Sequence, residues 1–548
     1  MIRITELSLP LGHPESALRK AIVTRLGIDE ADLQAFTVFK RSYDARKKNT
    51  EITFVYVIDA VVRDEQRLLE RLADDRHVSP APDTRYYPVV QAPTALEERP
   101  IIVGFGPCGL FAALVLAQMG FRPIVLERGK EVRQRTKDTW ALWREHELTP
   151  ESNVQFGEGG AGLFSDGKLY SQIKDPKFYG RKVMQEFVEA GAPEEILYVS
   201  KPHIGTFRLT GVVATMREQI RKLGGEVRFS SRVSDILIED GRVVGVKLAD
   251  GGEVHSRHVV MALGHSARDT FRMLHDRGVF MEAKPFAIGF RIEHPQSLID
   301  KARLGKYAGH PALGAADYKL VHHASNGRAV YSFCMCPGGT VVAATSEPGK
   351  VVTNGMSQYS RNERNANAGI VVGISPEQDF PGGVLAGVAL QEQLEERAFE
   401  LGGADYRAPG QQVGDFLRKR PSSEFAAVQP SYKPGVVPGD LAPSLPDYAI
   451  AAIREALPAF GRQIRGFDRD DAVLTGVETR TSSPVRITRD PASLQSVNTR
   501  GLFPAGEGAG YAGGILSAGV DGIKVAEAVA QSMLADTKGS ITHATVPG

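Results

Sequence analysis

The residues with the clearest chemical meaning are glycines that follow a short apolar segment. The stretch ERPIIVGF runs into Gly104, Gly106, Pro107 and Gly109, and the apolar segment LFAALVLAQMG comes next. In this pattern the first glycine permits a tight turn, the second lets the backbone approach a pyrophosphate, and the third lets helix and strand pack closely. The phosphates then lie at the positive N-terminus of the helix. The sequence therefore predicts a strand, a phosphate-binding turn and a helix.

A carboxylate lies at the position where a dinucleotide-binding site requires one. Glu127 ends the next predicted strand, RPIVLE, 18 residues after Gly109, and Arg128 follows it directly. A carboxylate at this position can accept hydrogen bonds from both ribose hydroxyls and would repel a 2′-phosphate. We therefore expect Glu127 and Arg128 at the site of a dinucleotide without that phosphate. A glycine turn that arose by chance is the alternative, and the complete strand–helix–strand context disfavours it.

A later segment bears on which dinucleotide is bound. Residues 223–264 alternate around the turns DGR and DGG, which predicts a small β-meander that returns to the main sheet. In many flavoproteins such a meander precedes a strand that ends in Ala-x-Gly, here Ala262 and Gly264. The position matching Val233 typically meets the adenine through its backbone. This segment favours FAD.

A second glycine cluster near the C-terminus supports the same cofactor. The segment TRGLFPAGE ends in Gly506 and Glu507 and resembles the flavoprotein segment whose terminal acid holds the ribityl chain, with Glu in place of Asp. Gly513, Gly514 and Ile515 then open a predicted helix. The N-terminus of this helix would point at flavin N1 and the C2 carbonyl and would stabilise the negative charge of reduced flavin. The two segments together predict FAD.

The chain resembles the glutathione-reductase-like flavoproteins with a single dinucleotide-binding fold. More closely, it is similar to the bacterial family of uncharacterised FAD-dependent dehydrogenases. Motifs over nearly the whole chain carry this likeness, among them FGEGGAGLFSDGKL (156–169), KPHIGT (201–206), GVETRTSSPVRI (476–487) and PAGEGAGYAGGILSAGVDG (504–522). The resemblance implies an FAD-dependent dehydrogenase and leaves its substrate open.

The resemblance also assigns a role to four small residues after the dinucleotide motif. It implies that Gly159, Gly160, Ala161 and Gly162 approach the FAD pyrophosphate or the isoalloxazine. Glycine permits such close backbone contact because it has no side chain. Lys168 follows and could bond flavin N5, although an ordinary surface lysine is an equal alternative.

The chain divides into regions by its patterns. Residues 1–95 predict a small α/β domain of β-α-β-β-α order followed by a Pro-rich linker. The predicted FAD domain, an α/β Rossmann-like fold of glutathione-reductase type, comprises 96–280 and 471–548. Residues 281–470 predict an inserted mixed α+β substrate domain, or cap.

Composition limits the partners and the compartment. Lys and Arg number 66 against 65 Asp and Glu, so no global field favours nucleic acid. Three cysteines in a chain of 548 residues disfavour a disulfide framework, and no apolar run approaches the roughly 20 residues that span a bilayer. The N-terminus has no long apolar segment of a signal peptide. We expect a cytoplasmic protein without a membrane partner, and the oligomeric state is open.

Other side chains carry weaker chemical expectations. His203 could donate a proton, since histidine titrates near neutral pH, or it could be a hydrogen-bonded structural residue. Arg480 and Arg486, with Glu478, could bind an anionic group or form an internal salt bridge. Asn354 could orient substrate or make a turn.

Cys334 and Cys336 invite a redox interpretation. Cys-x-Cys is a strained spacing for a disulfide, and no Cys or His cluster with zinc spacing surrounds the pair, so we expect no metal site. A structural or cavity-lining role is favoured over a dithiol relay.

These observations predict an FAD-dependent oxidoreductase that passes a hydride or an electron pair between a small-molecule substrate and flavin N5. The electron donor is either NAD(P)H that binds transiently or another reductant. One alternative is an FAD-dependent RNA-modifying flavoprotein in which the basic segment 40–48 docks RNA. Another is a flavin-binding protein whose FAD is structural.

Overall fold

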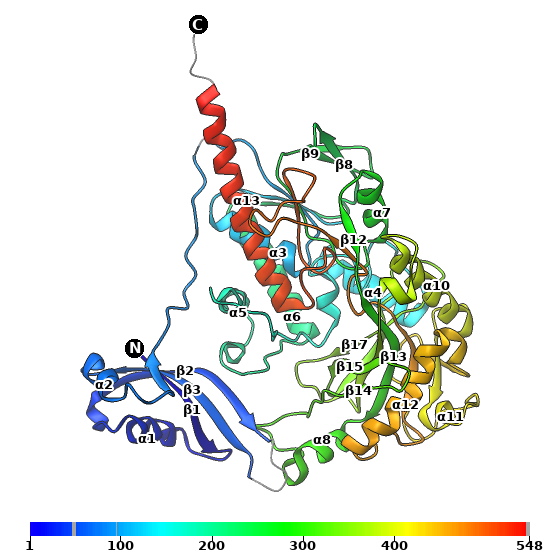
Figure 1. Cartoon of the computed structure of the whole chain (residues 1–548), viewed down its shortest axis with the longest axis horizontal. Coiled ribbons are helices and arrows are strands. Elements are labelled where there is room, and N and C mark those ends of the chain that lie inside the picture. The colour runs from blue at the N-terminus through cyan, green and yellow to red at the C-terminus, as the bar shows by residue number, and fades with distance from the viewer. Residues whose placement is uncertain (46–50, 95, 544–548) are drawn as a thin grey trace.

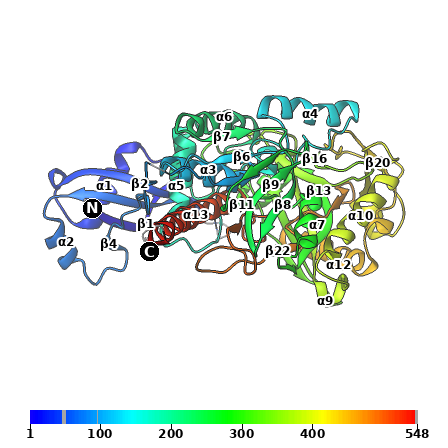
Figure 2. The same cartoon turned by 90° about the horizontal axis from the view of Figure 1, so that it is seen from above.

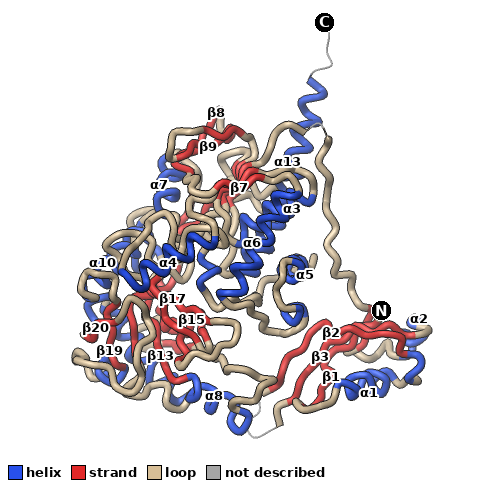
Figure 3. The backbone as a smooth tube through the Cα atoms, turned by 180° about the vertical axis from the view of Figure 1, so that it is seen from behind, coloured by secondary structure: helices blue, strands red, loops and turns tan. Residues whose placement is uncertain are grey.

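The computed structural model describes residues 1–45, 51–94 and 96–543. Three regions lie in a row, with the N-terminal region at one end and a large mixed sheet at the other (Figures 1 and 2). Two segments without helix or strand, residues 81–94 and 96–100, lie between the N-terminal region and the middle one (Figure 3). The basic segment expected at 40–48 is described only to residue 45, and its remainder lies outside the described residues.

The N-terminal region is a four-stranded sheet with two helices. Along β3 every second residue is buried, because one face of the strand covers an apolar core and the other does not. The strand order is β2-β3-β1-β4, so a short fourth strand joins the predicted β-α-β-β-α order. Its elements are β1 (Ile2–Pro10), α1 (Glu15–Leu26), β2 (Leu33–Asp44), β3 (Thr53–Val62), α2 (Glu65–Arg71) and β4 (Val78–Pro80).

The middle region is built on a five-stranded parallel sheet of order β23-β11-β5-β6-β7. β5, β6 and β11 are apolar triplets that are buried throughout, because helices cover both faces of a parallel sheet. Its α-helices are α3 (Pro107–Gln118), α4 (Val132–Glu145), α5 (Tyr179–Glu189), α6 (Thr206–Lys222), α7 (Arg268–Asp276) and α13 (Ile515–His543). Its strands are β5 (Ile101–Val103), β6 (Ile124–Leu126), β7 (Glu226–Arg228), β11 (Val259–Met261) and β23 (Leu502–Pro504).

Two smaller sheets complete the middle region. The predicted meander is present as an antiparallel sheet of β8 (Val233–Glu239), β9 (Arg242–Leu248) and β10 (Glu253–His255). The chain enters and leaves the third region through the antiparallel pair of β12 (Met281–Ala283) and β22 (Val485–Ile487). Segments far apart in the sequence therefore meet at one place.

The third region, which we call the cap (residues 286–478), contains a seven-stranded mixed sheet of order β14-β15-β18-β13-β21-β19-β20. Its strands are β13 (Phe286–Pro295), β14 (Val321–His323), β15 (Ala329–Cys336), β18 (Asn365–Ile374), β19 (Ala408–Gln412), β20 (Val436–Pro438) and β21 (Val473–Glu478), with β16 (Gly339–Ala343) and β17 (Thr353–Ser357) as a separate pair. Its helices are α8 (Gln296–Leu304), α9 (Pro376–Asp379), α10 (Ala386–Leu401), α11 (Val413–Leu417) and α12 (Asp447–Gln463). The expected boundary at residue 470 thus falls before β21, which pairs with β13 and β19 in this sheet.

The N-terminal sheet is joined to the middle region at its edge. The backbone N–H of Arg41 on β2 donates to the carbonyl of Tyr198 at 2.6 Å, and that of Ser200 donates to the carbonyl of Arg41 at 2.9 Å. The edge strand β2 thereby gains a short parallel partner around Val199. This pairing holds the segment that leads into the KPHIGT motif. Among the described helices, none is both long and apolar enough to cross a membrane.

Candidate functional site

The glycine turn after β5 is packed so closely that side chains are excluded. A Cβ atom on Gly109 would lie 2.0 Å from the carbonyl oxygen of Gly104, and one on Gly104 would lie 2.5 Å from the carbonyl oxygen of Ala262. A Cβ on Gly160 would lie 2.8 Å from the Cα atom of Gly106. Distances this short can be met only by glycine. The first and third motif glycines therefore bring strand, helix and the neighbouring strand together.

Glu127 is fixed by backbone donors. Its Oε2 accepts from the N–H of Phe105 at 2.8 Å, and its Oε1 accepts from the N–H groups of Gly129 and Gly157 at 2.8 and 2.9 Å. The residue is only 4% exposed, yet it lines a large cavity. The carboxylate is thus held in one orientation at the end of β6, with acceptor capacity left for hydroxyl donors.

One cavity of about 920 Å³ runs from the glycine turn through the middle region to the cap. It brings together most of the residues expected at a flavin site. Those that line it are Gly104, Gly106, Pro107, Glu127, Arg128, Gly160, Ala161, Gly162, Lys168, Val233, Ala262, Gly264, Glu507, Gly513, Gly514 and Ile515.

Three expected glycines lie behind the cavity wall. Gly109 packs against Gly104, and Gly159 donates its N–H to the carbonyl of Phe105 at 2.8 Å. Gly506 donates its N–H to Asp521 at 2.8 Å. These glycines support the turn and the wall through packing and backbone hydrogen bonds.

The residues at the start of α13 leave room for a ring system. A Cβ atom on Gly513 or Gly514 would meet no protein atom within 4 Å, although both glycines line the cavity. Glu507 also lines it and pairs with His265, with 3.2 Å between Oε1 and Nδ1. A long cavity with a carboxylate at each of two places, a glycine turn at a helix N-terminus and an open second helix N-terminus fits FAD.

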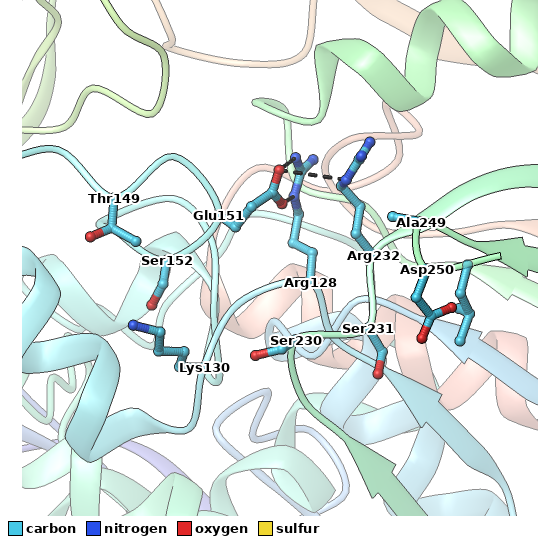
Figure 4. Close-up of a pocket in the computed structure, with 11 residues that line it drawn as sticks. Arg128, Lys130, Thr149, Glu151, Ser152, Ser230, Ser231, Arg232, Ala249 and Asp250 are labelled. Atoms are coloured by element: carbon cyan, nitrogen blue, oxygen red, sulfur yellow. Dashed lines mark hydrogen bonds and ion pairs between the residues drawn. The ribbon is translucent and has the colours of Figure 1, made fainter. Parts of the chain in front are cut away.

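A smaller cavity of about 310 Å³ opens beside the Glu127 end and shares Arg128, Ser231 and Arg232 with the large one (Figure 4). Arg128 is committed to protein partners: it lies 2.9 Å from both Glu151 and Asp269, and its guanidinium stacks 4.0 Å over the ring of Phe156. Burial opposes its charge, but Glu151 and Asp269 raise the pKa of Arg128. Its guanidinium thus shapes the wall between the two cavities.

At the cap end of the large cavity, Lys168 lies beside two cysteines. Its Nζ donates to the carbonyl of Met335 and is 4.0 Å from Asp166. Burial works against the charged amine, but Cys336, Cys334 and Asp166 outweigh it and raise the pKa of Lys168. The lysine is therefore a cation inside the cavity.

Cys334 reaches the cavity through an irregular backbone. The pairing of β15 with β18 shifts between Phe333 and Cys336, and Cys334 has φ +41°. Such bulges redirect side chains near functional sites. A hydrogen bond from Cys336, with Lys168 and Arg291 nearby, lowers the pKa of Cys334 despite its burial, while the bond to Cys334 and burial raise that of Cys336. Both thiols are free.

A buried ion pair that was not predicted from the sequence lies at the cap end of the large cavity. Arg291 on β13 is fully buried and holds Glu478 on β21 through Nε at 2.7 Å and Nη2 at 3.1 Å. Its other donors reach the carbonyl of Cys334 at 2.8 Å and Oδ1 of Asn354 at 3.0 Å. The signal in the sequence was an arginine that follows five apolar residues, FAIGF, at the start of a strand.

Two expected polar residues have structural partners. His203 does not line the large cavity: its Nε2 is 3.0 Å from the carbonyl of Tyr359, and its ring stacks on that residue. Burial, together with Arg361, lowers the pKa of His203, so the ring is neutral at pH 7. Arg480 forms the internal salt bridge, with Glu395 at 2.7 Å, and Arg268 holds the same carboxylate. In the described part of the chain, no group of three or more His, Cys, Asp or Glu residues could hold a metal ion.

The fold and the site together define an FAD-dependent oxidoreductase. Residues 198–307 match the model of the FAD-dependent oxidoreductase family, and residues 285–481 match that of the C-terminal-like domain of FAD-dependent proteins. A domain of unknown function matches residues 1–61. The predicted cofactor and reaction class are thereby confirmed.

A protein of Clostridium beijerinckii, named only as uncharacterised, is 48% identical over 528 residues, which are 96% of this chain and 98% of that protein. The chain belongs to the bacterial family of FAD-dependent dehydrogenases with which its motifs agree.

Solved structures resemble the chain more distantly. A mutant of the halogenase PltM in complex with FAD is 12% identical, with a TM-score of 0.40, over 80% of this chain and 71% of that one. Glycine oxidase from Bacillus cereus is 12% identical, with a TM-score of 0.29, over 80% of this chain and 96% of that one. These scores are low, and the family assignment stands on the sequence matches.

Proposed function

We propose that the protein transfers a hydride between a small-molecule substrate and N5 of bound FAD. The observation that carries this is the single large cavity, which joins the Glu127 end to Lys168 and to the cap. A cofactor site and a substrate site must share one water-excluding space if a hydride is to pass between them.

The residues of the chain have separate tasks in this proposal. Gly104, Gly106 and the N-terminus of α3 hold the pyrophosphate, and Glu127 accepts from the ribose hydroxyls. Glu507 holds a ribityl hydroxyl. The N-terminus of α13, directly after Gly513 and Gly514, faces the pyrimidine edge and favours the negative charge of the reduced ring. When bound, FAD supplies the two-electron chemistry.

Lys168 is the residue that we place against the reacting atoms. It lines the same cavity as residues 160–162 and reaches the cap wall through its hydrogen bond to the carbonyl of Met335. It can hold a proton or an anionic group there. His203 lies behind the wall, so we assign it a positioning role for the loop that carries it.

The domain division is part of the proposal. We assign residues 1–95 to an N-terminal domain, 96–280 and the chain after β21 to the FAD domain, and the cap to substrate choice. NAD(P)H visits the flavin transiently, because the described residues form one dinucleotide-binding sheet. We place the protein in the cytoplasm on its thiol content.

Anaerobic reduction tests the proposal. The FAD-loaded protein is mixed with NADH or NADPH without oxygen, and the visible flavin band is followed. We expect one nicotinamide to bleach the band and a substrate to restore or accelerate turnover. A flavin that no reductant bleaches on a useful timescale would show that the FAD is structural.

A further inference from the structure

At the cap end of the large cavity, positively charged side chains outnumber the carboxylates. Lys168, Lys201, Arg303 and Lys319 all line it. They come from distant parts of the chain, since Lys168 and Lys201 lie in the middle region, Arg303 ends α8, and Lys319 precedes β14. Such a convergence is built by the tertiary fold.

The carboxylates at this end already have partners. Asp166 is 1% exposed and is held by the guanidinium of Arg361, with Nε at 3.0 Å from Oδ1. Asp317 is held by Lys201 at 2.7 Å. Glu478 is held by Arg291. The negative groups are therefore committed to cations on the wall or at the rim.

Three cations are left over. Lys168 has a carbonyl partner and only a distant carboxylate, Asp166, at 4.0 Å. Arg303 donates through Nε to the backbone carbonyl of Asp317 at 3.2 Å, and, within the described ranges, neither Arg303 nor Lys319 has a salt bridge. The pKa of Cys334 is lowered by its neighbours, and even a thiolate at this position would leave a positive excess among the three cations.

The cations without a carboxylate partner extend from the rim of the cavity to its interior. Arg303 and Lys319 are exposed, whereas the side chain of Lys168 is 21% exposed and lies deeper. A cleft lined by one sign of charge concentrates ligands of the opposite sign, and a partly desolvated cation strengthens the contact at the inner end. An arrangement of this kind suits a ligand that enters with its anionic group among the cations.

We propose that this cationic end, formed by Lys168, Arg303 and Lys319, binds the carboxylate or phosphate group of a small anionic substrate. The inference rests on the proposed function, because it names the class of molecule that would meet the flavin. Arg303 and Lys319 select and guide the anion. Lys168 holds it next to the flavin ring.

The N-terminal region contributes to the same entrance. The pKa of Tyr43 on β2 is raised by burial and by the charge of Asp317. The charges of Lys201, Arg303 and Arg361 act on the same hydroxyl in the opposite direction. The pairing of β2 with residues 198–200 holds Lys201 at the rim. The anion would therefore enter between the cap and the end of β2.

The test uses the FAD-loaded full chain and requires no turnover. Succinate and inorganic phosphate are titrated separately, with sodium chloride replaced to keep the ionic strength constant, and the visible flavin spectrum is recorded. We expect a saturable difference spectrum with at least one of them. In the double variant Arg303→Gln, Lys319→Gln, the apparent Kd should rise roughly tenfold, since charged contacts are lost.

A matched control is Lys222→Gln, an exposed lysine at the end of α6 that does not line the cavity. It should leave both the Kd and the FAD content unchanged. A response to succinate alone assigns a carboxylate, and a response to phosphate alone assigns a phosphate.

Each of three results would overturn the inference. One is the absence of any saturable response to either anion, and another is an unchanged Kd in the double variant. Binding of a short RNA through these residues, without a response to small anions, would also overturn it and favour an RNA-modifying flavoprotein. Because bleaching by NADH or NADPH is measured independently, a failure here leaves the proposed oxidoreductase chemistry testable.

Discussion

The two ends of the large cavity are made of different parts of the polypeptide. At the Glu127 end, glycines and backbone N–H groups form much of the wall. At the cap end, the wall carries charged side chains from two stretches of the chain, with Lys168 and Lys201 in one and Arg303 and Lys319 in the other. The first end tolerates almost no side-chain change, whereas the second can change its side chains while the sheet beneath them stays.

This difference has a functional consequence. Backbone donors and glycine contacts suit a ligand that never changes, such as a cofactor. Side chains on a separate cap suit a ligand that differs between relatives, because specificity can alter without loss of the fold. We therefore expect substitutions at the two ends of the cavity to affect different properties of the protein.

The largest effect should come from Gly109→Ala. The added methyl group would lie 2.0 Å from the carbonyl oxygen of Gly104, inside the turn that joins β5 to α3. We expect loss of FAD and a poor yield of folded protein, measured by flavin content and by thermal unfolding. The control is Gly211→Ala in α6, where the Cβ atom meets nothing within 4 Å. That change should stabilise the helix by about 0.5–1 kcal/mol. Equal FAD content in both variants would contradict the packing argument.

The next effect belongs to the cap end. Arg291→Met leaves Glu478 buried without its partner, and the loss of one member of a buried pair costs about 3–5 kcal/mol. Urea unfolding of the FAD-loaded protein measures this loss. The double variant Arg291→Met, Glu478→Leu should regain much of it, because no lone charge stays buried. If both variants are equally unstable, the ion pair is not the cause.

A smaller effect is expected at Glu507 and Gly514, which line the large cavity near the start of α13. Glu507→Ala should weaken FAD binding roughly tenfold to a hundredfold, because a charge-assisted hydrogen bond is worth about 1.5–3 kcal/mol. Gly514→Val should weaken binding and also lower the reduction potential, since its side chain would enter the open space at the start of α13. Equilibrium dialysis and titration against a reference dye separate the two.

Glu189→Ala, an exposed change in α5, is the control for the variants at these two positions. Wild-type affinity and potential in the Glu507 and Gly514 variants would show that this segment does not face the flavin.

The smallest effect should follow Cys334→Ser or Cys336→Ser. The thiols are free, and their spacing is poor for a disulfide relay, so reduction of the flavin by small reductants should continue at nearly the wild-type rate. Stopped-flow absorbance measures it. A charge-transfer band that disappears in either variant would instead place a thiolate against the flavin and would make the cap end a redox partner.

The expectations held best where the signal was local. The strand, turn, helix and meander of the FAD region follow from glycine spacing and from runs of apolar residues, and the structure contains all of them. The C-terminal boundary of the cap was harder to predict. β21 belongs to the cap sheet because it pairs with β13 and β19, and the residues of β21 do not by themselves reveal which strands it pairs with. The roles of His203 and Arg480 were open for the same reason: their partners, Tyr359 and Glu395, are distant in the chain.

The sequence by itself determined the cofactor, FAD, and the glycine and carboxylate positions that we propose hold it. The motif glycines can be recognised by their spacing within one strand–turn–helix unit, although Gly104 also packs against Ala262 at the end of the neighbouring strand. Only the tertiary structure decided which charged side chains line the cap end of the same cavity. Lys168, Arg303 and Lys319 meet there because the cap sheet folds back over the FAD region. A charge acquires its function from the charges around it, and residues separated by more than a hundred positions become neighbours only when the chain has folded.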